Sequence, residues 1–438
     1  MLDIQFIRDN KDLVQENASK KGHTLDIGQL LTLDEERRAL LLKVEELNSL
    51  KNDINDLIQK SESPEEKIEI IAKGKEIKMQ IEEVSPLLQV KEQEYTDLLK
   101  QVPNIASADT PVGKDDTENV TLKEVGVVPK FSFAPLSHDE LGRALGVIDS
   151  ENAARIAGAR FTYLKGDLVK LQFAITQFVL DTVTNCDTLQ AIAEKNNIRV
   201  TAKPFTPVLP PVFIRPEVLD KMDRLEPKDD RYHLAEDDLY LTGSAEHTLG
   251  PLHMDEILNE GELPIRYIGY STAFRREAGT YGKDTKGLIR MHQFDKLEME
   301  SFTLPELGVD EQNFFVAIQE HLLTELGLPY QVQQVCTGDM GKPDARQIDI
   351  NTWFPAQDTY RETHTSDYMT DYQSRRLMIR VRRENGTLEY VHMNDGTAFA
   401  LGRILAAIME NNQAEDKSIV IPQALQKWVG KEKILCKE

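Results

Sequence analysis

The residues best suited to chemistry lie between Phe274 and Glu298. Arg275, Arg276 and Glu277 directly follow an apolar stretch, and a polar loop then leads into a second apolar stretch that ends at Glu298. The planar guanidinium of arginine binds phosphate oxygens two at a time, and a carboxylate can accept a hydrogen bond from an exocyclic amine. This combination suits a nucleotide. An ordinary hairpin with a salt-bridged surface explains the same residues equally well.

Two strands must hold these residues in place. Residues 265–274 alternate loosely and are rich in β-branched and aromatic side chains, which predicts a strand. A loop with Gly279, Gly282 and Gly287 follows, and a second alternating stretch runs to Glu298. Such hairpins among helical segments predict an α+β fold with a mainly antiparallel sheet flanked by helices. Neither G-x-G-x-x-G nor G-x-x-x-x-G-K-[ST] occurs in the chain, so a doubly wound nucleotide fold is not predicted.

The composition is that of an ordinary soluble protein. The 438 residues, 40% hydrophobic and 29% charged, suffice for two or three domains with buried cores. No apolar run approaches the roughly 18 residues of a membrane span, and the N-terminus lacks the features of a signal peptide. Cys186, Cys336 and Cys436 are widely spaced and predict neither a disulfide framework nor a zinc site. We therefore expect a cytoplasmic protein with no membrane partner.

The net charge of −22 argues against a nucleic-acid partner, because binding to phosphates requires clustered Lys and Arg. It does not exclude one, since a basic strip can lie on an acidic body. Only a specific motif can raise the expectation of RNA binding.

The N-terminal quarter of the chain carries helical patterns. Residues 1–30 predict a helix that ends near Gly22. Thr32, followed by acidic residues, is a suitable N-cap for a long helix. Ser63 and Pro64 then mark the start of a second long helix, with Pro64 at its first position.

Both long helices have apolar seams spaced by alternating steps of four and three residues, which predicts an antiparallel helical hairpin over residues 32–101. The seam positions are Leu40, Val44, Leu47, Lys51, Ile54 and Ile58, then Ile70, Gly74, Ile77, Ile81, Val84, Leu88, Lys91, Tyr95 and Leu98. Pro86 should kink the second helix or loosen one turn. A hairpin of this kind can serve dimerisation or scaffolding as well as ligand binding. Residues 34–100 hold eleven Lys and Arg against seventeen Asp and Glu, which fits RNA poorly.

Several stretches resemble one family. Residues 274–298 resemble motif 2 of the class II aminoacyl-tRNA synthetases, and residues 394–403 resemble motif 3. The proline-edged strand 207–214 resembles motif 1, with Pro211 matching the proline at the dimer interface. The N-terminal residues 1–8 are similar to those of bacterial-type seryl-tRNA synthetases. The resemblance covers nearly the whole chain in the order typical of that family.

The resemblance implies an activity, its partners and a domain organisation. The enzyme would activate L-serine with ATP, accompanied by Mg²⁺, and transfer the seryl group from seryl-adenylate to the 3′ end of tRNA-Ser. Residues 1–103 would form an arm that binds the long variable arm of the tRNA. Residues 104–135, which lack periodicity and contain several prolines, would be a linker, and residues 136–438 the catalytic domain. A homodimer would form through the motif 1 region near Pro211.

The resemblance also assigns residues to ATP. Arg275 would hold the α-phosphate, Glu277 would accept from the adenine amino group, and Phe294 would stack on the adenine. Arg403 would meet the γ-phosphate, and Glu362 would bind magnesium. The catalytic residues implied are Arg275, Glu362 and Arg403, and the full set implied for ATP is Arg275, Arg276, Glu277, Phe294, Glu362, Thr363, His364, Thr365 and Arg403.

Serine needs partners for an ammonium group, a carboxylate and a hydroxyl. The residues that the resemblance implies for serine are Ser244, Ala245, Glu246, Arg275, Glu298 and Thr397. Ser244–Glu246 matches a Thr-x-Glu element of the family. The chain departs from the family pattern at residues 362–368 and at Asp395–Thr397, which leaves the finer contacts to ATP and serine open.

Two other functions remain alternatives at this point. A paralogue could activate an amino acid and pass it to a carrier protein, but such paralogues usually lack a long helical arm. A coiled-coil scaffold could carry a degenerate synthetase domain, but Arg275, Glu362 and Arg403 are all present.

Overall fold

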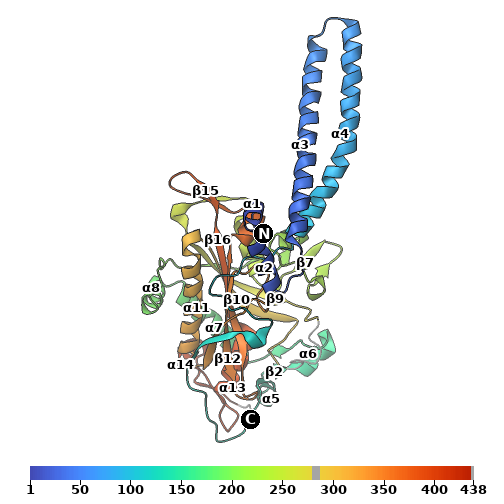
Figure 1. Ribbon diagram of the computed structural model, residues 1–438. Helices are drawn as coiled ribbons and strands as arrows, with labels where there is room; N and C mark the ends of the chain where they lie inside the picture. The colour runs from blue at the N-terminus through green and yellow to red at the C-terminus, as the bar shows by residue number, and fades with distance from the viewer. Residues whose placement is uncertain (279–286, 436–438) are drawn as a thin grey trace. The chain divides into compact units, whose positions relative to one another are not determined.

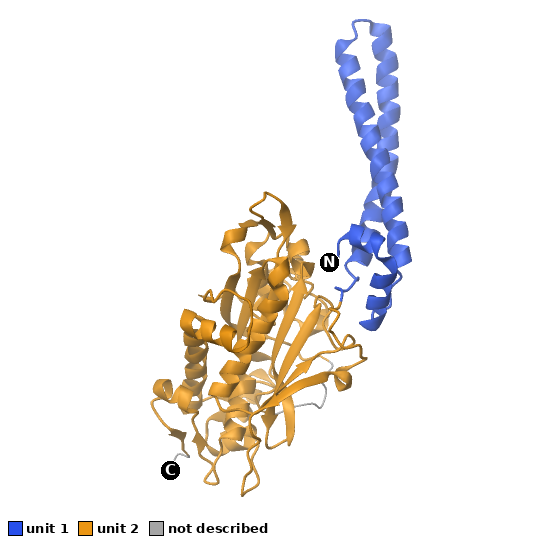
Figure 2. Cartoon of the chain, turned by 60° about the vertical axis from the view of Figure 1, so that its left-hand side comes forward, with its two compact units in different colours: residues 1–105 blue, residues 106–438 orange. Residues whose placement is uncertain are grey.

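The computed structural model describes residues 1–278 and 287–435, so Gly279, Gly282 and Cys436 lie outside the described residues. The chain divides into two compact units, residues 1–105 and residues 106–438 (Figure 2). The expected boundaries at 103 and 135 stay a prediction. None of the described helices is both long and apolar enough to cross a membrane.

The first unit is helical, with α1 (Ile4–Asp9), α2 (Lys11–Lys20), α3 (Ile27–Lys60) and α4 (Pro64–Leu99). The last two form the antiparallel hairpin predicted by the seams (Figure 1). Leu47, Ile54, Val84 and Leu88 are buried along it. Pro64 is the first residue of α4, as predicted, and the helix continues past Pro86.

The predicted N-cap of the first long helix is wrong. Thr32 lies inside α3, where its hydroxyl donates to the Gly28 carbonyl at 3.0 Å. The helix begins five residues earlier, since the Asp26 carboxylate accepts from the backbone of Gly28 at 2.7 Å and of Gln29 at 3.3 Å. Aspartate is favoured over threonine at an N-cap, and the earlier start also brings the buried Ile27 into the helix.

The second unit is built on an eight-stranded sheet. The strand order is β1-β11-β12-β13-β16-β10-β9-β4, and all neighbours are antiparallel except β4 and β9. The strands are β1 (Val120–Val125), β4 (Thr206–Val208), β9 (Ile265–Phe274), β10 (Gln293–Thr303), β11 (Tyr330–Gln334), β12 (Arg346–Phe354), β13 (Thr359–Thr370) and β16 (His392–Ala400). The mainly antiparallel α+β fold is thus confirmed, as is the strand over 265–274. β1 lies within the segment expected to be a linker and pairs with β11.

Helices flank this sheet and small two- and three-stranded sheets border it (Figure 1). The helices are α5 (His138–Ala144), α6 (Ser150–Ala157), α7 (Asp167–Val183), α8 (Cys186–Lys195), α9 (Pro216–Lys221), α10 (Glu246–Leu249), α11 (Gly308–Glu325), α12 (Tyr372–Leu377), α13 (Leu401–Asn411) and α14 (Gln423–Val429). The small sheets comprise β2 (Ile148–Asp149) with β3 (Tyr163–Leu164); β5 (Phe213–Ile214), β7 (Leu239–Leu241) and β6 (His233–Leu234); β8 (Ile257–Asn259), β14 (Arg380–Arg382) and β15 (Leu388–Tyr390); and β17 (Ile419–Val420) with β18 (Lys433–Ile434).

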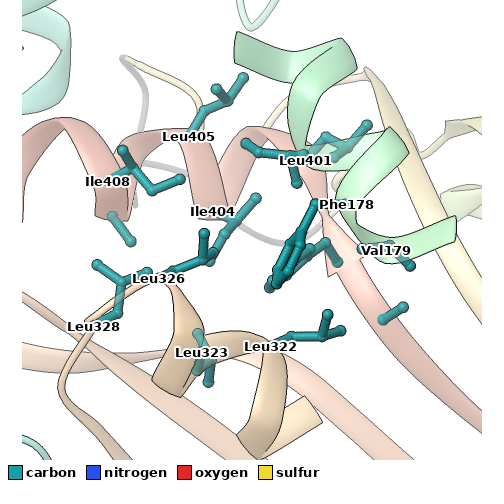
Figure 3. Close-up of a cluster of buried hydrophobic side chains, with 14 of the residues drawn as sticks. Phe178, Val179, Leu322, Leu323, Leu326, Leu328, Leu401, Ile404, Leu405 and Ile408 are labelled. Carbon is teal, nitrogen blue, oxygen red and sulfur yellow. The ribbon is translucent and has the colours of Figure 1, made fainter. Parts of the chain in front are cut away.

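The largest core of this unit lies where α7, α11 and α13 meet. Figure 3 shows Phe178 of α7, Leu322 of α11 and Ile404 of α13 converging there, all of them buried. The core fixes α13 against the sheet, and α13 carries Arg403. A capping box begins α5, with Ser137 and Glu140 as its two members.

Candidate active site

The hairpin that organises the site is formed by β9 and β10. Phe274 pairs with Gln293 and Gly269 pairs with Glu298, so the arginines lie at the loop end of the hairpin and Glu298 lies midway along it. The Arg275 guanidinium lies 5.4 Å from the centre of the Phe294 ring. Its Nε donates to the Gly243 carbonyl at 3.1 Å.

A cavity of about 290 Å³ opens beside this hairpin. Arg275, Glu277 and Phe294 line it from the hairpin, and Glu362 lines it from β13. Arg403, at the start of α13, completes the wall. The structure thus brings together four stretches of chain whose charged and aromatic side chains were assigned to ATP from the sequence.

Glu362 and Arg403 form an ion pair across this cavity. Arg403 Nη1 donates to Glu362 Oε1 at 2.9 Å and to the Glu362 carbonyl at 2.8 Å. The Glu362 side chain is half exposed. Burial acts to raise the pKa of its carboxyl, but Arg403 and Arg275 outweigh that effect and hold the pKa below 4.5. Glu362 therefore faces the cavity as an anion.

Glu277 is held in an unusual backbone conformation, with φ of 53°. Its carboxylate accepts from Arg290 Nη1 at 3.0 Å, and its carbonyl accepts from Arg160 Nη1 at 3.3 Å. A left-handed conformation at a non-glycine residue costs free energy and is common at functional sites. These two arginines fix the position of Glu277.

A polar cluster around Glu298 continues from the cavity into the protein. Lys296 Nζ lies 2.5 Å from Glu298 Oε2, and the Ser244 hydroxyl donates to the same oxygen at 3.1 Å. The Thr397 hydroxyl donates to Glu298 Oε1 at 3.4 Å. Lys296 and Thr397 line the cavity, and Glu298 is buried behind them. Burial raises the pKa of the Glu298 carboxyl, and Lys296 opposes this shift.

Ser244, Ala245 and Glu246 lie next to this cluster. The Glu246 backbone N–H donates to the Ser244 hydroxyl at 3.2 Å, and Ala245 is fully buried. Arg224 Nε donates to Glu246 Oε1 at 2.7 Å. Burial opposes ionisation of Glu246, but Arg224 lowers its pKa to about 2. None of these three residues is among the described residues that line the cavity. They therefore support the Glu298 cluster from the side away from the cavity.

Two residues assigned to ATP lie apart from the cavity. The Arg276 guanidinium lies 5.8 Å from the centre of the Tyr232 ring. His364 is buried, with its ring 5.2 Å from that of Phe399 and its Nδ1 2.8 Å from the Thr363 hydroxyl. Burial lowers the pKa of His364 to about 3, so its ring is neutral. The flanking residues Thr363 and Thr365 do line the cavity.

Lys296 was not predicted from the sequence, although it lines the cavity and contacts both Ser244 and Glu298. Its position two residues before Glu298 on one strand was an available signal, because such residues share a face. Asp349 was also missed. It lies opposite Thr365 on β12 and accepts from the Thr365 hydroxyl at 2.5 Å. Burial and the neighbouring Glu362 raise the pKa of Asp349 to about 7.

Three buried carboxyl groups lie side by side across three strands near the Glu298 cluster. Glu300 of β10 pairs directly with Asp395 of β16, which pairs with Asp367 of β13. Neither carboxylate oxygen of Glu300 has a hydrogen-bond partner in the described part of the chain. The nearest cation to Asp395 is Arg224, with Nη2 3.8 Å from Oδ2. Burial, reinforced by Asp395, raises the pKa of Glu300 well above 4.5.

Oxygen donors at the cavity fit magnesium that arrives with ATP. Mg²⁺ is usually held by one or two carboxylates together with substrate phosphates. Glu362 is an ionised carboxylate on the cavity wall, and Thr365, also on β13, lines the same cavity. The described residues contain no group of three His, Cys, Asp or Glu side chains that could hold a metal by itself.

Two sequence families match the chain. Residues 229–412 match the tRNA synthetase class II core domain (G, H, P, S and T). Residues 1–106 match the seryl-tRNA synthetase N-terminal domain. Every residue that lines the cavity lies within the first match.

Individual relatives match over the whole chain. The serine–tRNA ligase of Geobacter sulfurreducens is 38% identical over 433 residues, which cover 98% of this chain and 99% of the relative. That of Symbiobacterium thermophilum is 38% identical over 436 residues, which cover 99% of this chain and 100% of the relative. The crystal structure of seryl-tRNA synthetase from Pyrococcus horikoshii, complexed with ATP, has a TM-score of 0.87 at 34% identity and covers 100% of both chains.

Proposed function

Because the chain belongs to the seryl-tRNA synthetase family, it activates serine with ATP and charges tRNA, and we propose that both steps take place in the cavity beside β10. The observation that carries the proposal is the convergence of Arg275, Glu362 and Arg403 on that one cavity. These three charges come from the hairpin, from β13 and from α13. A cavity lined in this way can hold a triphosphate and a small amino acid together.

In the first step, the serine carboxylate attacks the α-phosphorus of ATP, a P–O bond forms, and pyrophosphate leaves. Negative charge builds up on the phosphoryl oxygens in the transition state, so fixed cations give most of the catalysis. Arg275 would hold the α-phosphate, and its contacts with Gly243 and Phe294, which restrict its guanidinium, support this role. Arg403 would exchange its contact with Glu362 for the γ-phosphate.

The adenine end of ATP is assigned to Phe294 and Glu277. Phe294 offers an aromatic ring on the cavity wall, and Glu277 offers a carboxylate that Arg290 anchors. Magnesium bound through Glu362 would neutralise phosphate charge when ATP is present. In this arrangement the side chains of Arg276 and His364 do not bind ATP. Thr363, next to His364 in the chain, does line the cavity.

Serine is assigned to the inner end of the cavity. The Glu298 carboxylate would accept from the ammonium group, and Thr397 would contact the hydroxyl. Arg275 would then lie between the serine carboxylate and the α-phosphate. A site built to hydrogen-bond a hydroxyl discriminates strongly against an amino acid that lacks it. In the second step, a ribose hydroxyl of the tRNA attacks the acyl carbon of seryl-adenylate, and AMP leaves.

The remaining partners follow from the family. We assign tRNA-Ser as the nucleic-acid substrate and α3 and α4 as the arm that binds its long variable arm. We assign a cytoplasmic homodimer, with the segment around Pro211 at its interface. Sedimentation of the protein at micromolar concentration should give twice the monomer mass of 49.8 kDa, and a monomer would contradict the dimer.

The decisive experiment is ATP–pyrophosphate exchange over a panel of amino acids. Serine should stimulate exchange far more than threonine, alanine or glycine, because alanine and glycine lack the hydroxyl and threonine carries an additional methyl group beside it. Exchange with another amino acid and not with serine would refute the assignment. Arg275→Ala should reduce exchange by about a hundredfold or more while the protein stays folded. Arg276→Ala, at the adjacent residue that stacks on Tyr232, is the matched control and should retain most activity.

A further inference from the structure

Four hydrogen bonds behind the cavity join segments of the chain that lie far apart in the sequence. The Leu288 backbone N–H donates to His138 Nε2 at 3.0 Å. His138 Nδ1 lies 2.7 Å from Glu410 Oε1, and the His138 backbone N–H donates to the same oxygen at 3.1 Å. The Ala356 backbone N–H donates to Glu410 Oε2 at 3.1 Å. His138 and Glu410 are both buried.

This arrangement fixes the tautomer of the imidazole ring. A backbone N–H can only donate, so His138 Nε2 must carry a lone pair towards Leu288. The ring hydrogen is then on Nδ1 and is donated to Glu410. The carboxylate of Glu410 accepts three hydrogen bonds and orients the ring, as a carboxylate does for a histidine that serves another group.

Each end of this network lies on a segment of chain that also carries a residue of the cavity wall. Leu288 lines the cavity and belongs to residues 287–292, the returning limb, which leads from the hairpin loop into β10. Glu410 lies seven residues after Arg403, two turns further along the same face of α13. Ala356 lies in the turn between β12 and β13, ahead of Glu362. One histidine–carboxylate pair thus ties together the three elements that carry the phosphate-binding residues.

The returning limb is closely fitted to this histidine. Gly287 has φ of +82°, and a Cβ atom built on it would lie 2.1 Å from His138 Nε2. Only glycine adopts this conformation readily and leaves room for the ring. On its other side the limb contacts the start of α13, where a Cβ on Gly402 would lie 2.7 Å from the Leu288 carbonyl.

We propose that His138 is a positioning residue for ATP. By accepting a hydrogen bond from the Leu288 N–H, it holds residues 287–292, which lead into β10, in the position where they border the bound nucleotide. This inference rests on the proposed ATP site. His138 is not a catalytic residue, because it is separated from the cavity by Leu288. It should affect the binding of ATP and leave the binding of serine unchanged, because the Glu298 cluster contains none of its partners.

Two substitutions separate the two ring nitrogens. His138→Asn retains a donor near the position of Nδ1 and offers nothing to Leu288, whereas His138→Gln places an acceptor near the position of Nε2. In the exchange assay, the Asn variant should raise the KM for ATP by about fivefold to tenfold, the effect of one buried hydrogen bond. The Gln variant should restore a KM close to that of the wild type. The KM for serine should stay the same in both.

Hydrogen exchange of the backbone around Leu288 gives a readout that is independent of activity. The amide should exchange faster in the Asn variant and regain protection in the Gln variant. His321→Asn, on α11, controls for the loss of a partly buried histidine elsewhere and should change neither measurement. Wild-type exchange activity is measured first, because its absence would refute the proposed function instead of this inference.

Equal KM values for ATP in the Asn variant and the wild type would overturn the inference, as would equal increases in the Asn and Gln variants. If the Asn variant does not fold, the wild-type protein still decides. Nitrogen-15 spectra of histidine-labelled protein should show His138 as the Nδ1–H tautomer. An Nε2–H tautomer or a doubly protonated ring would be incompatible with the hydrogen bond from Leu288.

Discussion

Glu298 and Glu300 share one face of β10 but differ in their partners: Glu298 has a cation and hydrogen-bond donors beside it, whereas Glu300 lies opposite another acid. Glu298 has Lys296, Ser244 and Thr397 as partners. Glu300, two residues further on, is completely buried, and within the described chain its carboxylate accepts no hydrogen bond. Its direct neighbour across the sheet is Asp395, another acid. Like charges in directly opposed positions destabilise a sheet, so Glu300 lowers the stability of the fold.

Replacing Glu300 by methionine, which has a similar volume, should therefore stabilise the protein by about 1–3 kcal/mol at neutral pH. The direction of the pH dependence follows from the pKa of the Glu300 carboxyl, which is raised in the folded state above 4.5. As the pH rises above 4.5, the unfolded chain releases this proton first, and the wild type loses stability that the methionine variant keeps. Denaturant unfolding at pH 5 and pH 8 should show a larger gain at pH 8.

The matched substitution Glu298→Met should have the opposite effect. It leaves the buried Lys296 ammonium without its partner, which typically costs about 3–5 kcal/mol. A Glu300→Met variant that is less stable than the wild type at pH 8 would mean that the carboxyl has a stabilising partner. A changed KM for serine in that variant would assign Glu300 to the substrate site.

The site residues that the sequence could predict are those that lie within continuous motifs. Arg275, Glu277 and Phe294 follow one another around a hairpin whose strands the alternation of side chains predicts. Lys296 could have been added from the same strand. The contacts of Glu300 could not, because its neighbour Asp395 is brought beside it by β16, some ninety residues later in the chain, and no local pattern records that pairing.

Among the elements, the helical hairpin was predictable and its start was not. The seams persist over many turns, so the pairing of α3 and α4 follows from their spacing alone. The beginning of α3 depends on a competition between two caps, Asp26 and Thr32, which the seam does not decide. Contacts along the hairpin show how the helices are paired: Lys91 Nζ lies 3.0 Å from Glu36, and a Cβ on Gly74 would lie 3.2 Å from Ile54.

This pairing allows the hairpin to be shortened without shifting its register. Positions 49 and 79 lie opposite each other if the pairs 36–91 and 54–74 are interpolated, so a short Gly/Ser turn can replace residues 50–78. The shortened enzyme should keep serine-dependent exchange and raise the KM for tRNA by at least about tenfold, because phosphate contacts are lost. A shortened enzyme that charges tRNA with the wild-type KM would contradict the role of the arm.

At the scale of the whole molecule, the charge of −22 opposes the approach of a polyanion such as tRNA. Local contacts between basic side chains and phosphates act in the other direction and release bound cations. The two effects respond oppositely to salt, since screening weakens the long-range repulsion and added salt weakens the contacts. The net charge alone therefore gave a misleading indication about the RNA substrate.

We expect the contacts to dominate. Raising salt from 50 to 200 mM should then increase the KM for tRNA by about tenfold or more, with little change in the KM for serine in the exchange reaction. Steady-state aminoacylation across this range measures both. A KM for tRNA that falls as salt rises would show that repulsion by the acidic body controls association.

The ion pair between Lys296 and Glu298 has a further consequence. The carboxylate is buried and lies 2.5 Å from an ammonium group before any amino acid is bound. The removal of its hydration shell is therefore completed during folding, and no part of that cost recurs in each catalytic cycle. In the proposed site, the α-ammonium of serine meets an acceptor whose orientation is already set, which is electrostatic preorganisation.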